Sequence, residues 1–266
     1  MKPSPPWRLF GAGLASTLAI SASASFAATV ANPQSNDIFL GFRASGGTGA
    51  STSYLVNLGP YSQFSGAAPD STISLSGVGD IGADLVATFC ANWNTRQDLS
   101  WGIFGVGSSS SATVYASKEQ STPGTPSEPW TLLDTTTRSS TYSQITSVIN
   151  ITGGYRGRES TANSTVGVLQ SNSAQASSYN YQVATNGTTD FGSVSQWSSI
   201  EGDFGSGVSG TRLDLFRINA SAVTSPGSFS IAPTGSLSFT AIPEPSAALM
   251  GLAGTALLLI RRRATH

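Results

Sequence analysis

Residues 228–240 read SFSIAPTGSLSFT, and this stretch indicates the fold class of the chain. Two runs that alternate between apolar and polar residues, 228–231 and 236–240, flank Pro233-Thr234-Gly235. Alternation with a period of two is typical of a strand with one buried face, and Pro and Gly between two such runs favour a turn. The stretch therefore predicts a β-hairpin.

Similar short runs recur toward the N-terminus. They lie at residues 37–43 (DIFLGFR), 53–58 (SYLVNL), 72–78 (TISLSGV), 99–106 (LSWGIFGV), 112–116 (ATVYA), 178–184 (SYNYQVA) and 212–218 (RLDLFRI). Gly, Pro and Ser separate most of them, which is typical of all-β domains.

Other segments of the central region are not strand-like. Residues 81–91 and 140–149 carry apolar side chains at helical spacing. Residues 156–177 are polar and rich in serine, which favours a long loop. We therefore expect a mainly β chain, an antiparallel β-sandwich or jelly-roll-like domain with one or two short helices.

The charge content limits the classes of partner. Charged residues make up 10% of the chain, against about 25% in an average soluble domain. The formal net charge is -1, and the central region has more acidic than basic residues and a single lysine, Lys118. Nucleic-acid binding needs clustered Lys and Arg, so we expect no nucleic-acid partner. The single cysteine, Cys90, has apolar neighbours, and we expect it to be a small buried hydrophobe.

The N-terminus has the pattern of a secretory signal peptide. Lys2 and Arg8 precede an apolar stretch at 9–20, and small residues lead to Ala27 and Ala28. The apolar stretch is too short to span a bilayer as a stable helix. We therefore expect a signal peptide at 1–27, cleaved between Ala27 and Ala28, followed by an exported β-rich domain at 28–241.

The C-terminal segment 242–266 combines three signals. Pro243-Glu244-Pro245 fixes an extended backbone that displays one carboxylate, because each proline restricts its own φ and the residue before it. Residues 247–260 are uncharged and mostly apolar, and Arg261, Arg262 and Arg263 follow them. A helix over 247–260 reaches about 21 Å, less than the roughly 30 Å hydrocarbon core, which suits a transient anchor. The arginines keep the end of that helix on the cytoplasmic side.

In these three parts and their order, residues 242–263 resemble the PEP-CTERM protein-sorting domain of Gram-negative bacteria. The resemblance implies recognition by an exosortase, an integral-membrane processing enzyme, and delivery to the cell surface, often alongside exopolysaccharide. Glu244 between Pro243 and Pro245 would be the recognition element, and 261–263 the stop-transfer cluster. The central pieces GFRASGG, SYLVNLG, IGADLVATF and LSWGIFGV also resemble PEP-CTERM proteins of Verrucomicrobia-type bacteria.

Catalytic motifs are sparse. The single histidine is His266, behind the predicted sorting signal, so the exported region has no Ser-His-Asp or Cys-His arrangement, and most zinc sites are excluded. Glycoside hydrolysis needs only two carboxylates, for which the pairs Asp80 with Asp84 and Glu201 with Asp203, and the single residues Asp98 and Asp190, are candidates. The first pair also fits the negative charge favoured at a helix start, and the second fits a solvated turn. We expect no enzyme activity, no cofactor and no metal.

Carbohydrate binding is an alternative that would use exposed aromatic rings. Trp101 lies in an apolar run and is expected in the core, whereas Trp130 follows a proline-rich loop and Trp197 lies among serines. Trp130 and Trp197 are thus the candidate carbohydrate contacts, although tryptophan is buried on average and packing explains them as well.

The sequence leads to three hypotheses for function. The first is an exported cell-surface or extracellular-matrix protein, sorted by an exosortase-type system and structural or adhesive in biofilm or exopolysaccharide. Its partners would be the processing enzyme, the inner membrane transiently, and exopolysaccharide. The second is a surface carbohydrate-binding module, and the third and least favoured is a carboxylate-dependent glycoside hydrolase.

Overall fold

The computed structural model of the protein describes residues 30–151, 153–171, 177–185, 191, 199–206 and 211–242. The predicted signal peptide with its cleavage site at Ala27 and Ala28, the sorting signal from Pro243 through Arg263, and Trp197 lie outside these described residues.

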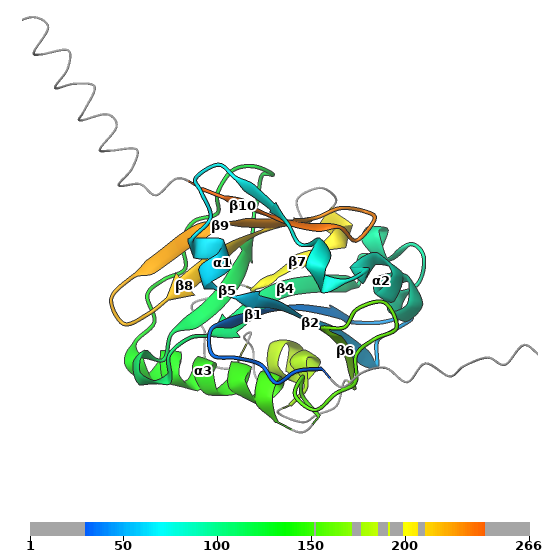
Figure 1. Ribbon diagram of the computed structural model, residues 1–266, viewed down its shortest axis with the longest axis horizontal. Coiled ribbons are helices and arrows are strands. Elements are labelled where there is room, and N and C mark those ends of the chain that lie inside the picture. The colour runs from blue at the N-terminus through cyan, green and yellow to red at the C-terminus, as the bar shows by residue number, and fades with distance from the viewer. Residues whose placement is uncertain are drawn as a thin grey trace, which may run out of the picture.

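The described chain forms one antiparallel sheet (Figure 1). Its strands are β1 (Asp37–Ala44), β2 (Thr52–Pro60), β3 (Thr72–Ser74), β4 (Leu99–Val106), β5 (Val114–Glu119), β6 (Gly167–Ser171), β7 (Glu201–Asp203), β8 (Arg212–Ile218), β9 (Val223–Ile231) and β10 (Leu237–Ala241). The order across the sheet is β3-β10-β9-β8-β5-β4-β1-β2-β6, with β7 beside β4. The predicted hairpin is confirmed, since β9 pairs with β10.

The helices are few and short. They are α1 (Ser62–Ser65), α2 (Ile81–Phe89) and α3 (Thr135–Asn150), together with short helical turns at Ser76–Val78, Trp93–Thr95, Ser109–Ser111, Tyr181–Thr185 and Phe204–Ser206. The predicted helix at 81–91 is confirmed as α2, where the Ala83 N–H donates to the Asp80 carboxylate. The predicted helix at 140–149 is also present, but α3 begins earlier, because Asp134 accepts a hydrogen bond from the Thr137 N–H.

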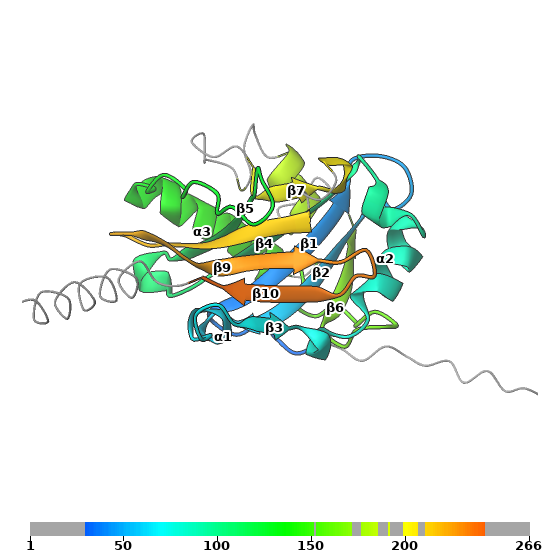
Figure 2. The ribbon, with the colours of Figure 1, turned by 90° about the horizontal axis from the view of Figure 1, so that it is seen from above.

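The sheet curls so that its two halves face each other. In Figures 1 and 2, β9 and β10 lie over β1 and β2 and cross them obliquely, and α3 lies on the other side of β1. The inner core, between the two halves, includes Ile38, Leu40, Phe42, Trp101, Phe229 and Phe239. The outer core, between the sheet and α3, includes Phe39, Phe104, Trp130, Ile145, Tyr179 and Phe216. The central strands are therefore buried on both faces, which explains why β1 is nearly all apolar.

The mainly β, antiparallel class with few short helices is confirmed. The predicted strand at 178–184 is wrong, because these residues begin a helical turn. Tyr179 and Val183 are four residues apart and both belong to the outer core, so a helical turn also places them on one face. The predicted long loop at 156–177 is interrupted by β6, in which Val168 pairs with Leu55 of β2.

Two glycines on neighbouring strands leave room for the Tyr179 ring to lie close to the sheet. Gly41 and Gly102 are partners in the β1–β4 pairing. A Cβ atom on Gly41 would lie 2.9 Å from the Tyr179 ring, and one on Gly102 would lie 2.8 Å from its hydroxyl. The absence of both side chains lets the ring lie against the backbone, which directs its hydroxyl toward β7.

Cys90 differs from its prediction. It is half-buried, and its thiol donates to the Asn92 side-chain oxygen at 2.7 Å. It ends α2 with φ of 92°, a conformation that side-chain-bearing residues rarely adopt. The turn that follows α2 moves the thiol out of the core.

No helix in the described ranges has the length and apolar character needed to cross a membrane. The apolar segment 247–260, predicted to be a transient anchor, lies outside those ranges.

Candidate functional site

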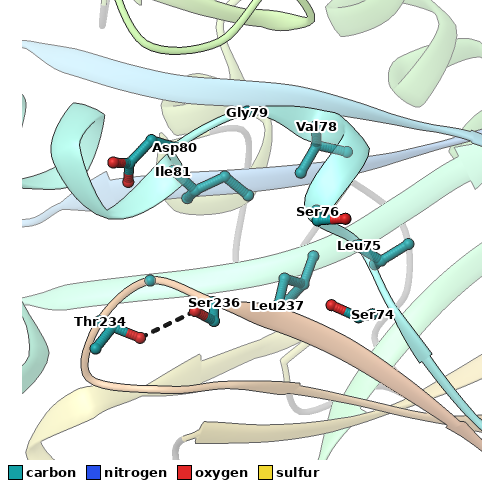
Figure 3. Close-up of a pocket in the computed structure, with 11 residues that line it drawn as sticks. Ser74, Leu75, Ser76, Val78, Gly79, Asp80, Ile81, Thr234, Ser236 and Leu237 are labelled. Carbon is teal, nitrogen blue, oxygen red and sulfur yellow. Dashed lines mark hydrogen bonds between the residues drawn. The ribbon is translucent and has the colours of Figure 1, made fainter.

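Two surface cavities and two buried carboxylate clusters are the candidate sites. The first cavity, which we call the hairpin pocket, has a volume of about 470 Å³ and lies between the β9–β10 turn and the start of α2 (Figure 3). Leu75, Val78, Ile81 and Leu237 supply apolar atoms, and Ser76, Asp80, Thr234 and Ser236 supply polar ones.

The polar groups of the hairpin pocket are engaged in local structure. The Thr234 and Ser236 hydroxyls are hydrogen-bonded to each other at 3.0 Å, as Figure 3 shows. The Asp80 carboxylate accepts the Ala83 N–H at 2.9 Å and so caps α2. A Cβ atom on Gly82 would lie 2.0 Å from the Thr234 carbonyl oxygen, so the turn packs directly on the helix. This pocket is best explained as the junction of the turn with α2.

The second cavity, which we call the C-terminal groove, is larger, at about 850 Å³. Its apolar lining comes from Tyr61 and Phe64 in and before α1, from Ala67 and Pro69 after it, and from the last described residue, Ile242. Further residues come from the loop 126–129 and from the beginning of β9, including Glu128, Thr224 and Pro226. The groove therefore opens where the chain leaves the sheet.

Glu201 is the centre of the first buried cluster. The Arg43 guanidinium donates to both carboxylate oxygens, at 2.9 and 2.5 Å, and the Tyr179 hydroxyl donates to one of them at 2.9 Å. Glu201 is buried in β7. The interpretation of Glu201-Gly202-Asp203 as a solvated turn is therefore wrong, because pairing with β4 makes these residues a strand.

A small pocket of about 200 Å³ adjoins this cluster. Lys118, Glu119 and Ser121 line it together with Glu201. Burial raises the pKa of the Glu119 carboxyl above its ordinary value, and the negative charge of Asp203 raises it further. Because Glu201 is held by Arg43 and Tyr179, it is engaged in a structural network rather than poised as a free acid or base.

Asp84 is the centre of the second buried cluster. Its carboxylate accepts hydrogen bonds from the Tyr54 hydroxyl at 2.8 Å, the Asn163 amide at 2.9 Å and the Thr161 hydroxyl. Asp84 is 3% exposed, whereas Asp80 is exposed and caps the helix. The two carboxylates thus have separate structural roles, and the network joins α2 to β2 and to the segment before β6.

Burial of two tyrosines makes the stability of the fold sensitive to alkaline pH. It raises the pKa of the Tyr54 phenol well above its ordinary value of 10.0, and the Asp84 carboxylate raises it further. Burial also raises the pKa of Tyr155, with a smaller contribution from Asp37. In the unfolded chain these phenols would lose protons near pH 10 while the folded chain keeps them protonated.

We expect the free energy of unfolding to be insensitive to these phenols below about pH 9 and to fall as the pH rises above about 10. Urea unfolding of wild type and Tyr54→Phe across this range tests the expectation. The variant has no ionisable group at residue 54. The slope of its free energy of unfolding against pH should therefore be smaller than that of the wild type by about 1.4 kcal/mol per pH unit. Equal slopes above pH 10 would contradict it, and parallel curves at lower pH serve as the control.

The structure shows the burial of two of the three tryptophans considered in the sequence analysis. Trp101 is fully buried, as expected. Trp130 is only 5% exposed; its indole N–H donates to the Ser117 carbonyl at 3.2 Å, and the Lys118 ammonium lies 4.5 Å from the ring centre. Its ring therefore packs in the outer core and offers no open face for stacking on a sugar. Trp197 lies outside the described residues.

The chain matches no protein-family model, no curated protein and no solved structure. Among the residues that the structure describes, no three His, Cys, Asp or Glu side chains form a group that could hold a metal ion. Sequence reasoning missed the C-terminal groove, although several of the chain's prolines, at positions 69, 126, 129 and 226, meet in its lining.

Proposed function

We propose that this chain is an exported cell-surface or extracellular-matrix protein that an exosortase-type system sorts by its C-terminal signal. It would cross the inner membrane behind its signal peptide, and the segment 247–260 would anchor it transiently. Its role would be structural or adhesive, in biofilm or exopolysaccharide. The support comes from the three-part C-terminal pattern and from the place where the folded sheet ends.

The end of the sheet is the observation that carries the proposal. β10 ends at Ala241, and the Ile242 N–H donates to the Pro226 carbonyl at 3.1 Å. The motif Pro243-Glu244-Pro245 begins at the next residue. The motif therefore begins directly after the last described residue of the sheet domain, the order in sequence that a removable C-terminal signal needs.

The buried carboxylates favour a structural role over hydrolysis. Asp84 and Glu201 are each held by several donors, and Asp214 accepts hydrogen bonds from Gln120 and Ser127. We also propose that the facing halves of the curled sheet, with the inner core between them, are a variant of sandwich or jelly-roll packing. The carbohydrate-binding alternative has less support, because the ring of Trp130 is buried.

The test is the intact mass of the protein recovered from native cells. We expect the wild type to lack residues 1–27 and most of the segment after Pro245, and a Glu244→Ala variant to keep the C-terminal helix. Glu159→Ala, at an exposed carboxylate outside the motif, is the matched control and should be processed like the wild type. Retention of the chain through His266 in the wild type would overturn the proposal and leave a membrane-tethered β domain.

A further inference from the structure

Tyr61 and Tyr115 form a close pair of stacked rings beside the C-terminal groove. Their ring centres lie 4.4 Å apart, with an angle of 19° between the ring planes. This distance is at the close end of the range for aromatic pairs in proteins. The other tyrosine ring contacts between described residues have phenylalanine as the partner. The pair is therefore the place in the described chain where two phenol rings face each other.

Asn36 holds both members of the pair. Its backbone carbonyl accepts the Tyr61 N–H at 2.8 Å, and its side-chain oxygen accepts the Tyr115 hydroxyl at 2.9 Å. The φ of Asn36 is 71°, in the left-handed region that asparagine adopts more readily than most residues with a side chain. One residue thus fixes the start of α1 against β5, so the stack is preorganised by the backbone as well as by ring packing.

The two rings differ in their access to solvent. Tyr61 is half-buried and lines the C-terminal groove, whereas Tyr115 is 2% exposed and belongs to the inner core. A small oxidant that enters the groove therefore meets Tyr61 directly, and Tyr115 reacts through its contact with the Tyr61 ring. This arrangement favours reaction within the pair over reaction of Tyr115 with another molecule.

The cysteine content leaves the fold without a disulfide cross-link. Proteins outside the cytoplasm commonly carry disulfides, because those compartments are oxidising. Cys90 has no second cysteine in the chain to pair with. A covalent link within an exported form of this chain would therefore need other side chains that an oxidant can couple, and the stacked phenols of Tyr61 and Tyr115 meet that need.

We propose that Tyr61 and Tyr115 are a site of oxidative cross-linking, in which a carbon–carbon bond joins the two rings at positions ortho to their hydroxyls. Each phenol gives up one electron and its hydroxyl proton, and the two phenoxyl radicals combine. The two ortho C–H bonds then break, and their protons move to the phenoxyl oxygens, which restores both phenols. The two electrons and two protons released reduce one hydrogen peroxide to two waters, through a one-electron catalyst such as a haem peroxidase.

The cross-link would join the start of α1 to β5, two elements that are separated in the sequence by β3, α2 and β4. Such a bond stabilises the folded chain mainly by restricting the unfolded one, as a disulfide does. The setting in which the chain meets peroxide rests on the proposed function, whereas the chemistry of the pair does not.

Photo-oxidation of the purified full-length chain, held in detergent micelles, tests the cross-link. Ruthenium tris-bipyridine with persulfate is the one-electron oxidant. We expect monomers that have lost two hydrogen atoms by intact mass, and a proteolytic product that contains both Tyr61 and Tyr115. The cross-linked chain should unfold at a higher urea concentration than the untreated chain. Oxidation in urea should lower the yield of this product at least about tenfold, because the unfolded chain no longer holds the rings together.

Single variants locate the bond. Tyr61→Phe and Tyr115→Phe keep a stacked ring and remove one phenol, so each should abolish the product. Tyr142→Phe, at a half-buried tyrosine of α3, is the matched control and should leave the yield unchanged. Loss of two hydrogens that persists in Tyr61→Phe, or cross-links formed only between copies of the chain, would overturn the proposal.

The cross-link and the sorting route have separate outcomes. If the wild type forms the Tyr61–Tyr115 product but is recovered from native cells with its C-terminus intact through His266, the cross-link stands and the sorting route is rejected. If oxidation gives no such product while the C-terminal segment is removed in cells, the cross-link is rejected and the sorting route stands.

Discussion

Replacing Arg43 with alanine is expected to lower the free energy of unfolding by about 3–5 kcal/mol, the loss typical of removing one partner of a buried ion pair. The side chains of Arg43 and Glu201 are 15% and 5% exposed. Without the guanidinium, the Glu201 carboxylate would keep only the Tyr179 hydroxyl among these partners. A buried charge that loses its counterion costs more than the lost attraction alone.

Urea unfolding at neutral pH measures this loss. The double variant Arg43→Met, Glu201→Gln removes both charges and keeps an amide oxygen for Tyr179, so it should be less destabilised than Arg43→Ala. Arg156→Ala is the control, because Arg156 is exposed and its Nε donates to the Asn32 side chain at the surface; its change should stay within about 0.5 kcal/mol. Equal stability of Arg43→Ala and Arg156→Ala would show that the pair is not buried in solution.

Replacing Phe104 with alanine is expected to have an effect of similar size, about 3–5 kcal/mol, because it opens a cavity in the outer core. Phe104 is fully buried. Its ring centre lies 5.0 Å from that of Tyr179, 5.3 Å from Phe191 and 6.2 Å from Phe39. The loss also removes the ring that Tyr179 stacks on, so the hydrogen bond to Glu201 should weaken with it.

The same unfolding measurement separates cavity formation from loss of apolar area in general. Phe104→Leu keeps most of the side-chain volume and should cost about 1.5 kcal/mol. Leu169→Ala, at a side chain that is 45% exposed, should change the free energy by about 0.5 kcal/mol or less. If Phe104→Ala were no more destabilised than Leu169→Ala, the outer core would not be packed as described.

Strand patterns in the sequence predicted most of the sheet. The runs at 99–106 and 212–218 coincide with β4 and β8, and the run at 37–43 falls one residue short of the end of β1. These runs are dense in apolar residues, and the sheet is covered on both sides of its centre, so burial reinforces local preference. In β8 the face with Asp214 is buried as well, because Gln120 and Ser127 hydrogen-bond the carboxylate.

The predictions that were wrong or missing depend on contacts between residues far apart in the sequence. Glu201 and Arg43 are 158 residues apart, and nothing near Glu201 in the sequence distinguishes a paired strand from a turn. Tyr179 lies on the sheet because Gly41 and Gly102 leave room for its ring, which local periodicity does not reveal. The C-terminal groove was missed for the same reason, since its lining comes from several separate segments. The sorting signal stays a prediction from sequence.

The pairing of β3 with β10 sets a constraint on when the domain can fold. Thr72 in β3 meets Thr240 in β10, 168 residues later, and β5 finds its partner β8 only in the last third of the chain. A chain that emerges from a membrane N-terminus first therefore cannot close its sheet until almost all of it has crossed. On the proposed export route the sheet would stay incomplete during passage, because the partner strands of β3 and β5 lie late in the chain. β10 is the last strand, and Pro243 follows it by two residues, so on that proposal completion of the fold and arrival of the predicted sorting signal would coincide in time.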